Sequence, residues 1–312
     1  MTSRNLKIVF LGSAEFAVPA LDALVRAGYE VAAVVTQPDR ARGRGGHTRP
    51  TPVGLYAETA GLKTLKPERL KGNDEFFEAL YKAGPDLIVV AAYGKLLPKS
   101  LLEIPPLGCV NIHASLLPEY RGAAPVQRAI LDGKRETGVT LIYMLEELDA
   151  GDIIADAKTD ASNMNAGELT AALAGLGAAL LIAELPKVAD GTAKRIPQEA
   201  AKATYAEKIE KAEGELDFNR TAEDIVLRVR AMSPSPGAYI MKDGVRIGVT
   251  SAKALKHDSD EAPGTVLEVS KQGIKARAGE GAVLIEAIKM PGRKAMPVEE
   301  YLKGNSFNAT SL

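Results

Sequence analysis

An amide, an imidazole and a carboxylate that could act together in catalysis belong to or follow one apolar segment: they are Asn111, His113 and Asp149. Asn111 and His113 alternate along the expected strand Cys109–His113, so their side chains point to the same face. An amide donor beside a titratable donor suits a carbonyl oxygen that becomes an oxyanion. A carboxylate at Asp149 would orient the imidazole and favour its charged form. The set predicts acyl or formyl transfer with no covalent enzyme intermediate.

A purely structural explanation exists for the same residues. Residues 148–152, Leu-Asp-Ala-Gly-Asp, have the composition of a turn, and Asn or His at a strand end can cap one. The positions of the histidines favour the catalytic interpretation over the structural one. Of the three histidines, His47 lies in a loop rich in Arg and Gly and His257 in a polar segment, so only His113 belongs to an apolar strand.

Composition excludes several classes of protein. The length of 312 residues suits two domains, and 46% hydrophobic with 25% charged residues is ordinary for a globular chain. The single cysteine, Cys109, excludes an intrachain disulfide, predicts a buried apolar role and indicates the cytoplasm. Too few soft ligands exist for a structural zinc site, so no metal is expected. No signal segment is recognised and no apolar run approaches the length that spans a bilayer, so no membrane association is expected.

Alternating apolar segments predict a Rossmann-like, doubly wound and mostly parallel sheet in residues 1–190. The expected strands are 7–11, 30–36, 87–91 and 109–113, followed by a strand pair, 137–144 and 153–157, around Asp149. The expected helices are 16–27, 74–83, a short one around Lys99, and 166–184. The first strand ends in a lone Gly12 without a G-x-G-x-x-G turn, which counts against a dehydrogenase.

The composition changes after residue 190. Residues 191–206 are polar and predict an interdomain linker. Residues 207–312 contain one helical segment, 222–232, and short strands separated by glycine-marked turns. These strands, 238–241, 245–250, 265–269, 274–277 and 283–288, predict a small OB-like β-barrel domain.

Several motifs carry a resemblance to a known family. They are G-S-A-E-F-A from Gly12, T-Q-P-D-R from Thr36, A-Y-G-K-L-L-P from Ala92, G-C-V-N-I-H from Gly108, S-L-L-P from Ser115, Y-R-G-A-A-P from Tyr120 and T-G-V-T from Thr137. With them the chain resembles the methionyl-tRNA formyltransferases, folate-dependent enzymes that formylate initiator methionyl-tRNA. It departs from that family at Glu119, where Arg is common, at Ala150, where Thr is common, and in having no tryptophan.

The resemblance implies specific roles. Asn111, His113 and Asp149 are the expected catalytic residues, with 10-formyltetrahydrofolate as co-substrate and methionyl-tRNA as acceptor. The expected folate-binding residues are Ser115, Leu116, Leu117 and Pro118, together with Tyr93 and Gly94. A cytoplasmic monomer is expected.

Basic residues predict the contacts with tRNA. The loop of residues 40–49 contains four arginines, Arg40, Arg42, Arg44 and Arg49, whose charge suits a phosphate backbone. A solvated surface loop is the alternative. Residues 207–312 contain sixteen Lys/Arg and sixteen Asp/Glu, so RNA binding there requires local clustering. Lys289, Arg293 and Lys294 are the candidates.

Other functions stay open on the sequence. A formyltransferase acting on an amino-sugar nucleotide, a 10-formyltetrahydrofolate hydrolase module and a glycinamide ribonucleotide formyltransferase share the same catalytic set. The arginine-rich loop and residues 207–312 favour a tRNA acceptor. An RNA-binding protein with an inactive α/β domain is the non-enzymatic alternative, and an assay of folate binding separates it from the enzymes.

Overall fold

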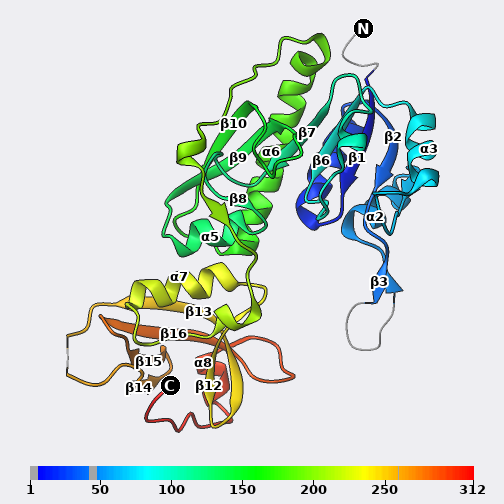
Figure 1. Ribbon diagram of the computed structural model, residues 1–312. Coiled ribbons are helices and arrows are strands. Elements are labelled where there is room, and N and C mark those ends of the chain that lie inside the picture. Colours follow the sequence, from blue (N-terminus) through cyan, green and yellow to red (C-terminus); the bar gives the residue numbers. More distant parts are fainter. Residues whose placement is uncertain (1–5, 42–47, 259) are drawn as a thin grey trace. The chain divides into compact units, whose positions relative to one another are not determined.

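The chain forms two compact units, each built around its own sheet (Figure 1). The computed structural model describes residues 6–41, 48–258 and 260–312. The first unit comprises Met1–Pro125, Glu136–Asp160 and Thr170–Ala206, and the second comprises Val126–Arg135, Ala161–Leu169 and Glu207–Leu312. The predicted order of an α/β domain followed by a β-rich domain is confirmed.

The first unit is organised by a seven-stranded sheet in the order β10-β9-β7-β6-β1-β2-β5. The strands are β1 Lys7–Gly12, β2 Glu30–Val35, β5 Thr64–Leu65, β6 Leu87–Ala91, β7 Cys109–His113, β9 Glu136–Tyr143 and β10 Ile153–Asp160. β1, β2, β5, β6 and β7 pair in parallel, whereas β9 is antiparallel to both β7 and β10. The carboxyl ends of β1, β2, β6 and β7 therefore meet at one edge, where α/β sheets commonly bind ligands.

Helices cover this sheet. They are α1 Val18–Arg26, preceded by the 3-10 turn η2 Glu15–Ala17, α2 Pro52–Thr59, α3 Asp74–Ala83, α4 Lys99–Leu102 and α6 Ala166–Asp190. A glycine in α6, Gly177, lets the helix approach the sheet closely, because a Cβ there would lie 2.6 Å from the Ile112 side chain. Ile112 faces α6, so strand alternation directs Asn111 and His113 to the opposite face.

The length of α6 corrects one expectation. With 25 residues and a mean hydropathy of 1.8 over its most apolar window, α6 is long and apolar enough to cross a bilayer, contrary to the sequence-based expectation. Core helices of globular proteins share these properties. Several of its side chains, among them Leu169, Leu173, Leu181 and Leu185, are almost completely buried. They show that α6 buries one face inside the protein, with 39% of its most apolar window buried.

The second unit contains an antiparallel sheet in the order β12-β13-β16-β15-β14. Its strands are β12 Ala238–Lys242, β13 Val245–Leu255, β14 Val266–Ser270, β15 Gly273–Arg277 and β16 Ala282–Lys289, and β17 Met296–Pro297 pairs with β16. Among the described residues no pairing joins β12 to β14, so the predicted barrel closure is not confirmed. The helix α7 Ala222–Met232 begins at Thr221, whose side chain accepts a hydrogen bond from the Asp224 amide.

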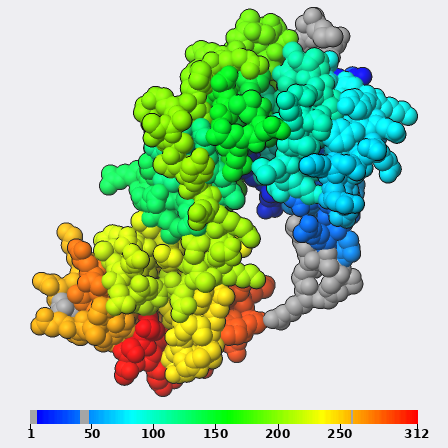
Figure 2. All heavy atoms as spheres, in the orientation of Figure 1, coloured from blue at the N-terminus to red at the C-terminus, as the bar shows by residue number. Residues whose placement is uncertain are grey.

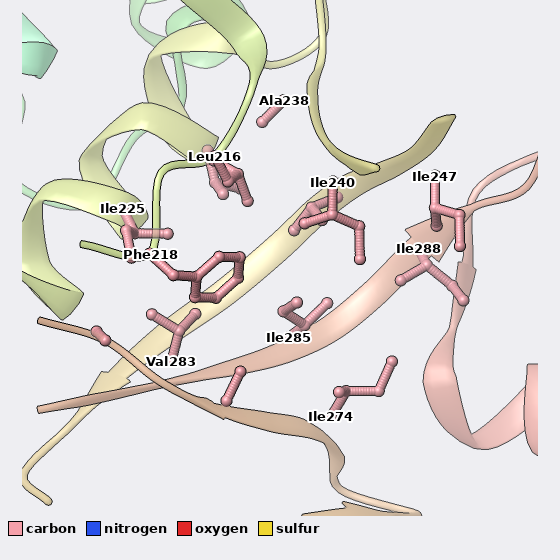
Figure 3. Packing of buried hydrophobic residues seen from close by; sticks show 14 of the residues in the cluster. Leu216, Phe218, Ile225, Ala238, Ile240, Ile247, Ile274, Val283, Ile285 and Ile288 are labelled. Atoms are coloured by element: carbon pink, nitrogen blue, oxygen red, sulfur yellow. The ribbon is translucent and has the colours of Figure 1, made fainter. Parts of the chain in front are cut away.

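One apolar cluster forms the core of this sheet domain (Figure 3). Phe218 and Ile225 meet Ile240, Ile285 and Ile288 from the strands. The pattern of α7, with apolar Ile225 and Val229 four residues apart, is that of a helix burying one stripe. Burial of this stripe joins α7 to the sheet.

Several short elements were not predicted. They are α5 Pro125–Leu131, α8 Val298–Leu302, the 3-10 turns η3 Ala200–Lys202 and η4 Lys211–Gly214, the pair β8 Arg121–Gly122 with β11 Tyr205–Ala206, and the pair β3 Arg40–Ala41 with β4 Thr48–Arg49. The helix α2 and the two-residue strand β5 were also not anticipated. Residues 191–206, expected as a linker, lie in the first unit, where β11 pairs with β8 and Ile196 pairs with Ile153.

Ile285 tests the core of the second unit, because its side chain is completely buried. We expect Ile285→Ala to lower the free energy of unfolding by about 2–5 kcal/mol, and Ile285→Val by about 0.5–1.5 kcal/mol. Native-state hydrogen exchange of the β15 and β16 amides measures both losses. Equal losses for the two variants would contradict tight packing around this side chain.

Candidate active site

The loops that follow β1, β2 and β6 are joined by hydrogen bonds into one continuous edge. The Ser13 amide donates to the Ala92 carbonyl at 3.2 Å. The Gln37 side chain donates to the Tyr93 carbonyl at 2.8 Å, and its backbone amide donates to Ser13 Oγ at 3.0 Å. Because backbone groups at strand ends are satisfied here by side chains, the edge has a defined shape.

Asn111 and His113 lie in β7, between β6 and β9. Asn111 is opposite Val90 on one side, and His113 is opposite Thr140 on the other. Their side chains keep only 9% and 6% exposure. Within the described part of the chain the Asn111 amide makes no hydrogen bond, so its two N–H donors are available for a bound group.

The backbone sets the tautomer of His113. Its Nε2 lies 2.9 Å from the Tyr120 carbonyl oxygen, which can only accept, so Nε2 carries a proton. The other ring nitrogen, Nδ1, lies 3.5 Å from Asp149 Oδ2. Tyr120 has a φ of 61°, a conformation that L residues rarely adopt. The ring is therefore held through Nε2, and Nδ1 is the nitrogen that faces the carboxylate.

Asp149 is held from the backbone of β8. Its Oδ2 accepts a hydrogen bond of 2.9 Å from the Gly122 amide, and its own φ is 51°. Gly122 has a φ of 121°, and a Cβ there would lie 2.8 Å from the Ala206 carbonyl oxygen. Only glycine fits this position, because the backbone of strand β11 lies so close.

The segment Ser115–Pro118 forms a tight loop beside this pair. Thr140 Oγ1 donates to the Ser115 carbonyl at 2.7 Å and accepts from the Leu117 amide at 3.0 Å. Ser115 Oγ donates to the Glu119 carbonyl at 2.6 Å, and the Leu117–Pro118 peptide bond is cis. Ser115 and Leu117 are buried, whereas Leu116 and Pro118 are half-buried. The loop presents a partly apolar surface that Thr140 holds in shape.

The structure places Tyr93 differently from the expectation. The Tyr93 side chain is 2% exposed and packs with core residues that include Val9, Leu11 and Leu101, so it does not line an open cleft. Burial raises the pKa of Tyr93 to about 12. Gly94, with a φ of 80°, lies against the Gln37 side chain, which would be 2.7 Å from a Cβ there.

The candidate tRNA-binding residues lie in two places. Arg40 and Arg49 are exposed and opposite each other in the β3–β4 pair, while Arg42 and Arg44 are outside the described residues. Lys289, Arg293 and Lys294 are exposed, at the end of β16 and in the turn that follows it. The orange-to-red part of the chain, to which this segment belongs, reaches the surface of the second unit (Figure 2). None of these three has a carboxylate within 4 Å among the residues that the structure describes.

Models of two domain families match this chain. Residues 6–185 match the formyl transferase model, and residues 208–306 match the model of the formyl transferase C-terminal domain. The chain belongs to the formyl transferase family. The described residues contain no group of three or more His, Cys, Asp or Glu able to hold a metal ion.

Two relatives match this chain over nearly its whole length. The chain is 43% identical over 300 residues to a methionyl-tRNA formyltransferase of Moorella thermoacetica, with 96% of each chain covered. It is 41% identical over 305 residues to the methionyl-tRNA formyltransferase of Bacillus subtilis, covering 97% of this chain and 96% of that protein.

Solved structures of lower identity show the same fold. The crystal structure of HypX from Aquifex aeolicus with tetrahydrofolic acid has a TM-score of 0.65 at 21% identity, covering 96% of this chain and 47% of that one. An N-formyltransferase from Helicobacter canadensis, solved with folinic acid and dTDP-3-aminofucose, has a TM-score of 0.66 at 17% identity, covering 90% of this chain and 98% of that one.

Sequence reasoning assigned no role to three side chains that shape the family site. Arg121 is 4% exposed and donates to the Gln198 side chain, and Gln198 in turn binds the loop of Asp149. Thr140 holds the Ser115–Pro118 loop. Arg121 and Thr140 lie inside quoted motifs, which is a usable signal. Gln198 has no local signal, because only the fold brings it to Asp149.

Tyr93 generates a prediction about alkaline stability. Its pKa of about 12 in the folded protein exceeds the ordinary value of 10.0, so its stabilising contribution is complete below pH 10 and is lost as the pH rises through 12. Tyr93→Phe should remove this part of the loss and cost little at pH 8, because the hydroxyl has no hydrogen-bond partner among the described residues.

Urea unfolding at pH 8 and pH 11 measures the effect. Burial also raises the pKa of the Cys109 thiol to about 12. Tyr93→Phe should therefore still lose stability between pH 8 and pH 11, but less than the wild type loses. Tyr93→Phe/Cys109→Ala should remove both contributions. An unchanged difference between the two pH values in Tyr93→Phe would contradict the assignment.

Proposed function

We propose that this chain transfers the formyl group of 10-formyltetrahydrofolate to the α-amino group of methionine on initiator methionyl-tRNA. The observation that carries the proposal is the available Asn111 amide beside the His113–Asp149 pair at the carboxyl edge of the sheet. The chain offers this site within a sequence that is 43% identical to a methionyl-tRNA formyltransferase over nearly its whole length. Translation initiation in the cytoplasm, by a monomer, is the corresponding role.

Asn111 and His113 act on the formyl group, which is the electrophile of the reaction. Attack of the amine on the formyl carbon places negative charge on the formyl oxygen. The Asn111 amide donates to that oxygen, and the His113 ring lies beside it, with Nε2 bound to the Tyr120 carbonyl and Nδ1 facing Asp149. Fixed donors stabilise this charge more than they stabilise the neutral formamide, so they accelerate the chemical step.

Asp149 acts on His113 and on the attacking amine. Its carboxylate lies 3.5 Å from His113 Nδ1 and orients the ring. The attacking amine must also lose a proton, which Asp149 accepts directly or through water. The bond between the formyl carbon and N10 of the folate then breaks, and the same proton passes to N10, so that tetrahydrofolate leaves as the neutral amine. One of its oxygens is occupied by the Gly122 amide, which keeps the carboxylate in reach of both partners.

Folate binding is assigned to the loop Ser115–Pro118. Its half-buried Leu116 and Pro118 offer apolar contacts to the pteridine, while Thr140 keeps the loop from collapsing. Gly94 is assigned to the same site, where it leaves room for the Gln37 side chain that binds the Tyr93 carbonyl. Tyr93 contributes through its backbone only, since its ring is in the core. The HypX structure with tetrahydrofolic acid has the same fold, which supports a folate site on this type of sheet.

Basic side chains are assigned to the tRNA. Arg40 and Arg49 lie opposite each other in the β3–β4 pair, an arrangement that is unfavourable unless an anion lies between them. A phosphate group satisfies that condition, and Arg42 and Arg44 belong to the same loop. This supports acceptor-stem binding by residues 40–49.

Residues 207–312 are proposed as an OB-like tRNA-binding domain beside a catalytic domain of residues 1–190 and a connection of residues 191–206. Lys289 lies opposite Gly248, and Gly248 lies opposite Tyr239. The Arg246 guanidinium stacks 3.6 Å above the Tyr239 ring, so it adds a further cation to the same strands. Because the Tyr239 ring is buried, it serves to hold Arg246, and the exposed cations Arg246 and Lys289 are the groups that suit a phosphate backbone.

The first prediction on activity concerns Asn111. Asn111→Ala should lower kcat about 100- to 1,000-fold, because removal of one oxyanion donor costs about 2.7–4 kcal/mol. Formation of formylmethionyl-tRNA from 10-formyltetrahydrofolate measures it. Asn163→Ala, an exposed amide, is the control and should leave kcat unchanged. Full activity of Asn111→Ala would refute the assigned role, and transfer to a sugar nucleotide instead of the tRNA would refute the acceptor.

The second prediction on activity concerns the cations of the second unit. Replacing Lys289, Arg293 and Lys294 with Ala should raise the KM for methionyl-tRNA and leave the KM for folate unchanged. The slope of log affinity against log salt should fall by about 2–3, the value for three lost phosphate contacts. The control triple Lys208→Ala, Lys256→Ala and Lys271→Ala changes the charge equally. Equal effects of the two triples would show that only net charge matters.

A further inference from the structure

We propose that Gln198 is a positioning residue for Asp149, and that Arg121 fixes the orientation of the Gln198 amide. The inference deepens the proposed function, on which its kinetic test rests. Gln198 does not touch the reacting groups. It acts by holding the turn from which the Asp149 carboxylate reaches His113.

Both N–H donors of the Gln198 amide bind the loop of Asp149. Its Nε2 donates to the Asp149 carbonyl at 2.8 Å and to the Gly151 carbonyl at 2.8 Å. These two carbonyls flank Ala150, so a single amide closes the turn from outside. Because Asp149 has a φ of 51°, its backbone conformation is costly by itself and depends on such contacts.

Arg121 determines which end of the Gln198 amide faces the turn. Arg121 Nε and Nη2 donate to Gln198 Oε1 at 3.1 and 2.8 Å. A guanidinium has donors only, so the amide oxygen must face Arg121 and the amide nitrogen must face the two carbonyls. With Arg121 only 4% exposed, a reversed amide would leave buried donors unpaired.

The segment that carries Gln198 is itself anchored on both sides. Before it, Ile196 exchanges two hydrogen bonds, of 2.8 and 3.0 Å, with Ile153 at the start of β10. After it, Thr204 Oγ1 accepts from the Tyr120 amide at 2.8 Å, and the Ala206 carbonyl accepts from the Ala123 amide at 2.9 Å. The segment therefore supports Tyr120, whose carbonyl binds His113, as well as Asp149. One stretch of chain positions both members of the pair.

A turn this far from the end of β7 needs such support. β9 runs antiparallel to β7, so the chain leaves β9 at Tyr143, opposite Val110, and the Met144 amide binds the Cys109 carbonyl. Three residues, or about 10 Å, separate Val110 from His113 along the strand. The loop must fold back over that distance to bring Asp149 within 3.5 Å of the ring, and Gln198 binds it where it does so.

The decisive variant is Gln198→Glu. A carboxylate still accepts from Arg121 and keeps that buried cation paired, but it cannot donate to the two carbonyls. We expect kcat for formyl transfer to fall roughly 10- to 100-fold, the scale on which small displacements of a catalytic group act, with the KM for folate unchanged. The adjacent Glu199→Gln, which breaks only an exposed pair with Lys202, is the control and should leave both values unchanged.

A double-mutant cycle separates positioning from a general loss of stability. If Gln198 acts through Asp149, then Gln198→Glu should cost little further kcat in an Asp149→Asn background. A full additional loss in that background would overturn the proposal. Gln198→Asn keeps the amide but withdraws it by one carbon, so it provides a second variant without an added charge. Its kcat should lie between those of the wild type and Gln198→Glu.

A readout without substrate keeps the two proposals distinguishable. The ¹⁵N resonance of His113 Nδ1 reports the nearby carboxylate, and the chain has only three histidines to assign. Gln198→Glu should change this resonance in the same direction as Asp149→Asn, and Glu199→Gln should not. An unchanged resonance in Gln198→Glu overturns the positioning role, whatever the activity. If the wild type transfers no formyl group but Gln198→Glu still changes the resonance, the proposed function alone is refuted.

Discussion

The antiparallel pairing of β9 with β7 imposes the constraint on which the candidate site depends. Parallel strands deliver their carboxyl ends to one edge, and β1, β2, β6 and β7 do so here. β9 runs the other way, so its carboxyl end lies beside the start of β7 and away from that edge. A carboxylate from the loop after β9 reaches His113 only if other contacts bend the loop back.

Backbone groups do most of this bending. The Gly122 amide binds the Asp149 carboxylate, and the Tyr120 carbonyl binds His113. Gln198 binds the turn of Asp149 from the other side. Each such hydrogen bond contributes only about 0.5–1.5 kcal/mol to stability, but leaving a buried partner unpaired costs about 1–3 kcal/mol. Their common effect is to make one arrangement of His113 and Asp149 much more favourable than the others.

The polar groups assigned to catalysis and the cations assigned to RNA differ in exposure. The groups beside His113 are almost fully buried, and there an amide, an imidazole and a carboxylate act at short range. The cations assigned to RNA are exposed, and they act on a charged backbone through a screened field. This division is consistent with a small formyl donor that must be enclosed and a large acceptor that need only be held at its phosphates.

Local patterns in the sequence were sufficient for most of the longer helices and strands. β6, β7, α3 and α7 have the predicted bounds to within a residue, because apolar periodicity reflects the face that each element buries. The motifs also predicted that Asn111, His113 and Asp149 act together, and the structure brings His113 within 3.5 Å of Asp149, although only Asn111 and His113 are neighbours in sequence.

What connects these residues was decided by the tertiary structure. Gln198 is 49 residues from Asp149, and its surroundings in sequence are polar and ordinary, so no pattern predicts the contact. The Tyr93 ring was misplaced for the same reason, because a Tyr-Gly pair at a strand end does not show which side of the sheet receives the ring. Barrel closure likewise depends on pairing between the outer strands, and strand number alone does not determine it. Periodicity is a property of neighbours along the chain, whereas these features depend on contacts between distant segments that only the folded chain brings together.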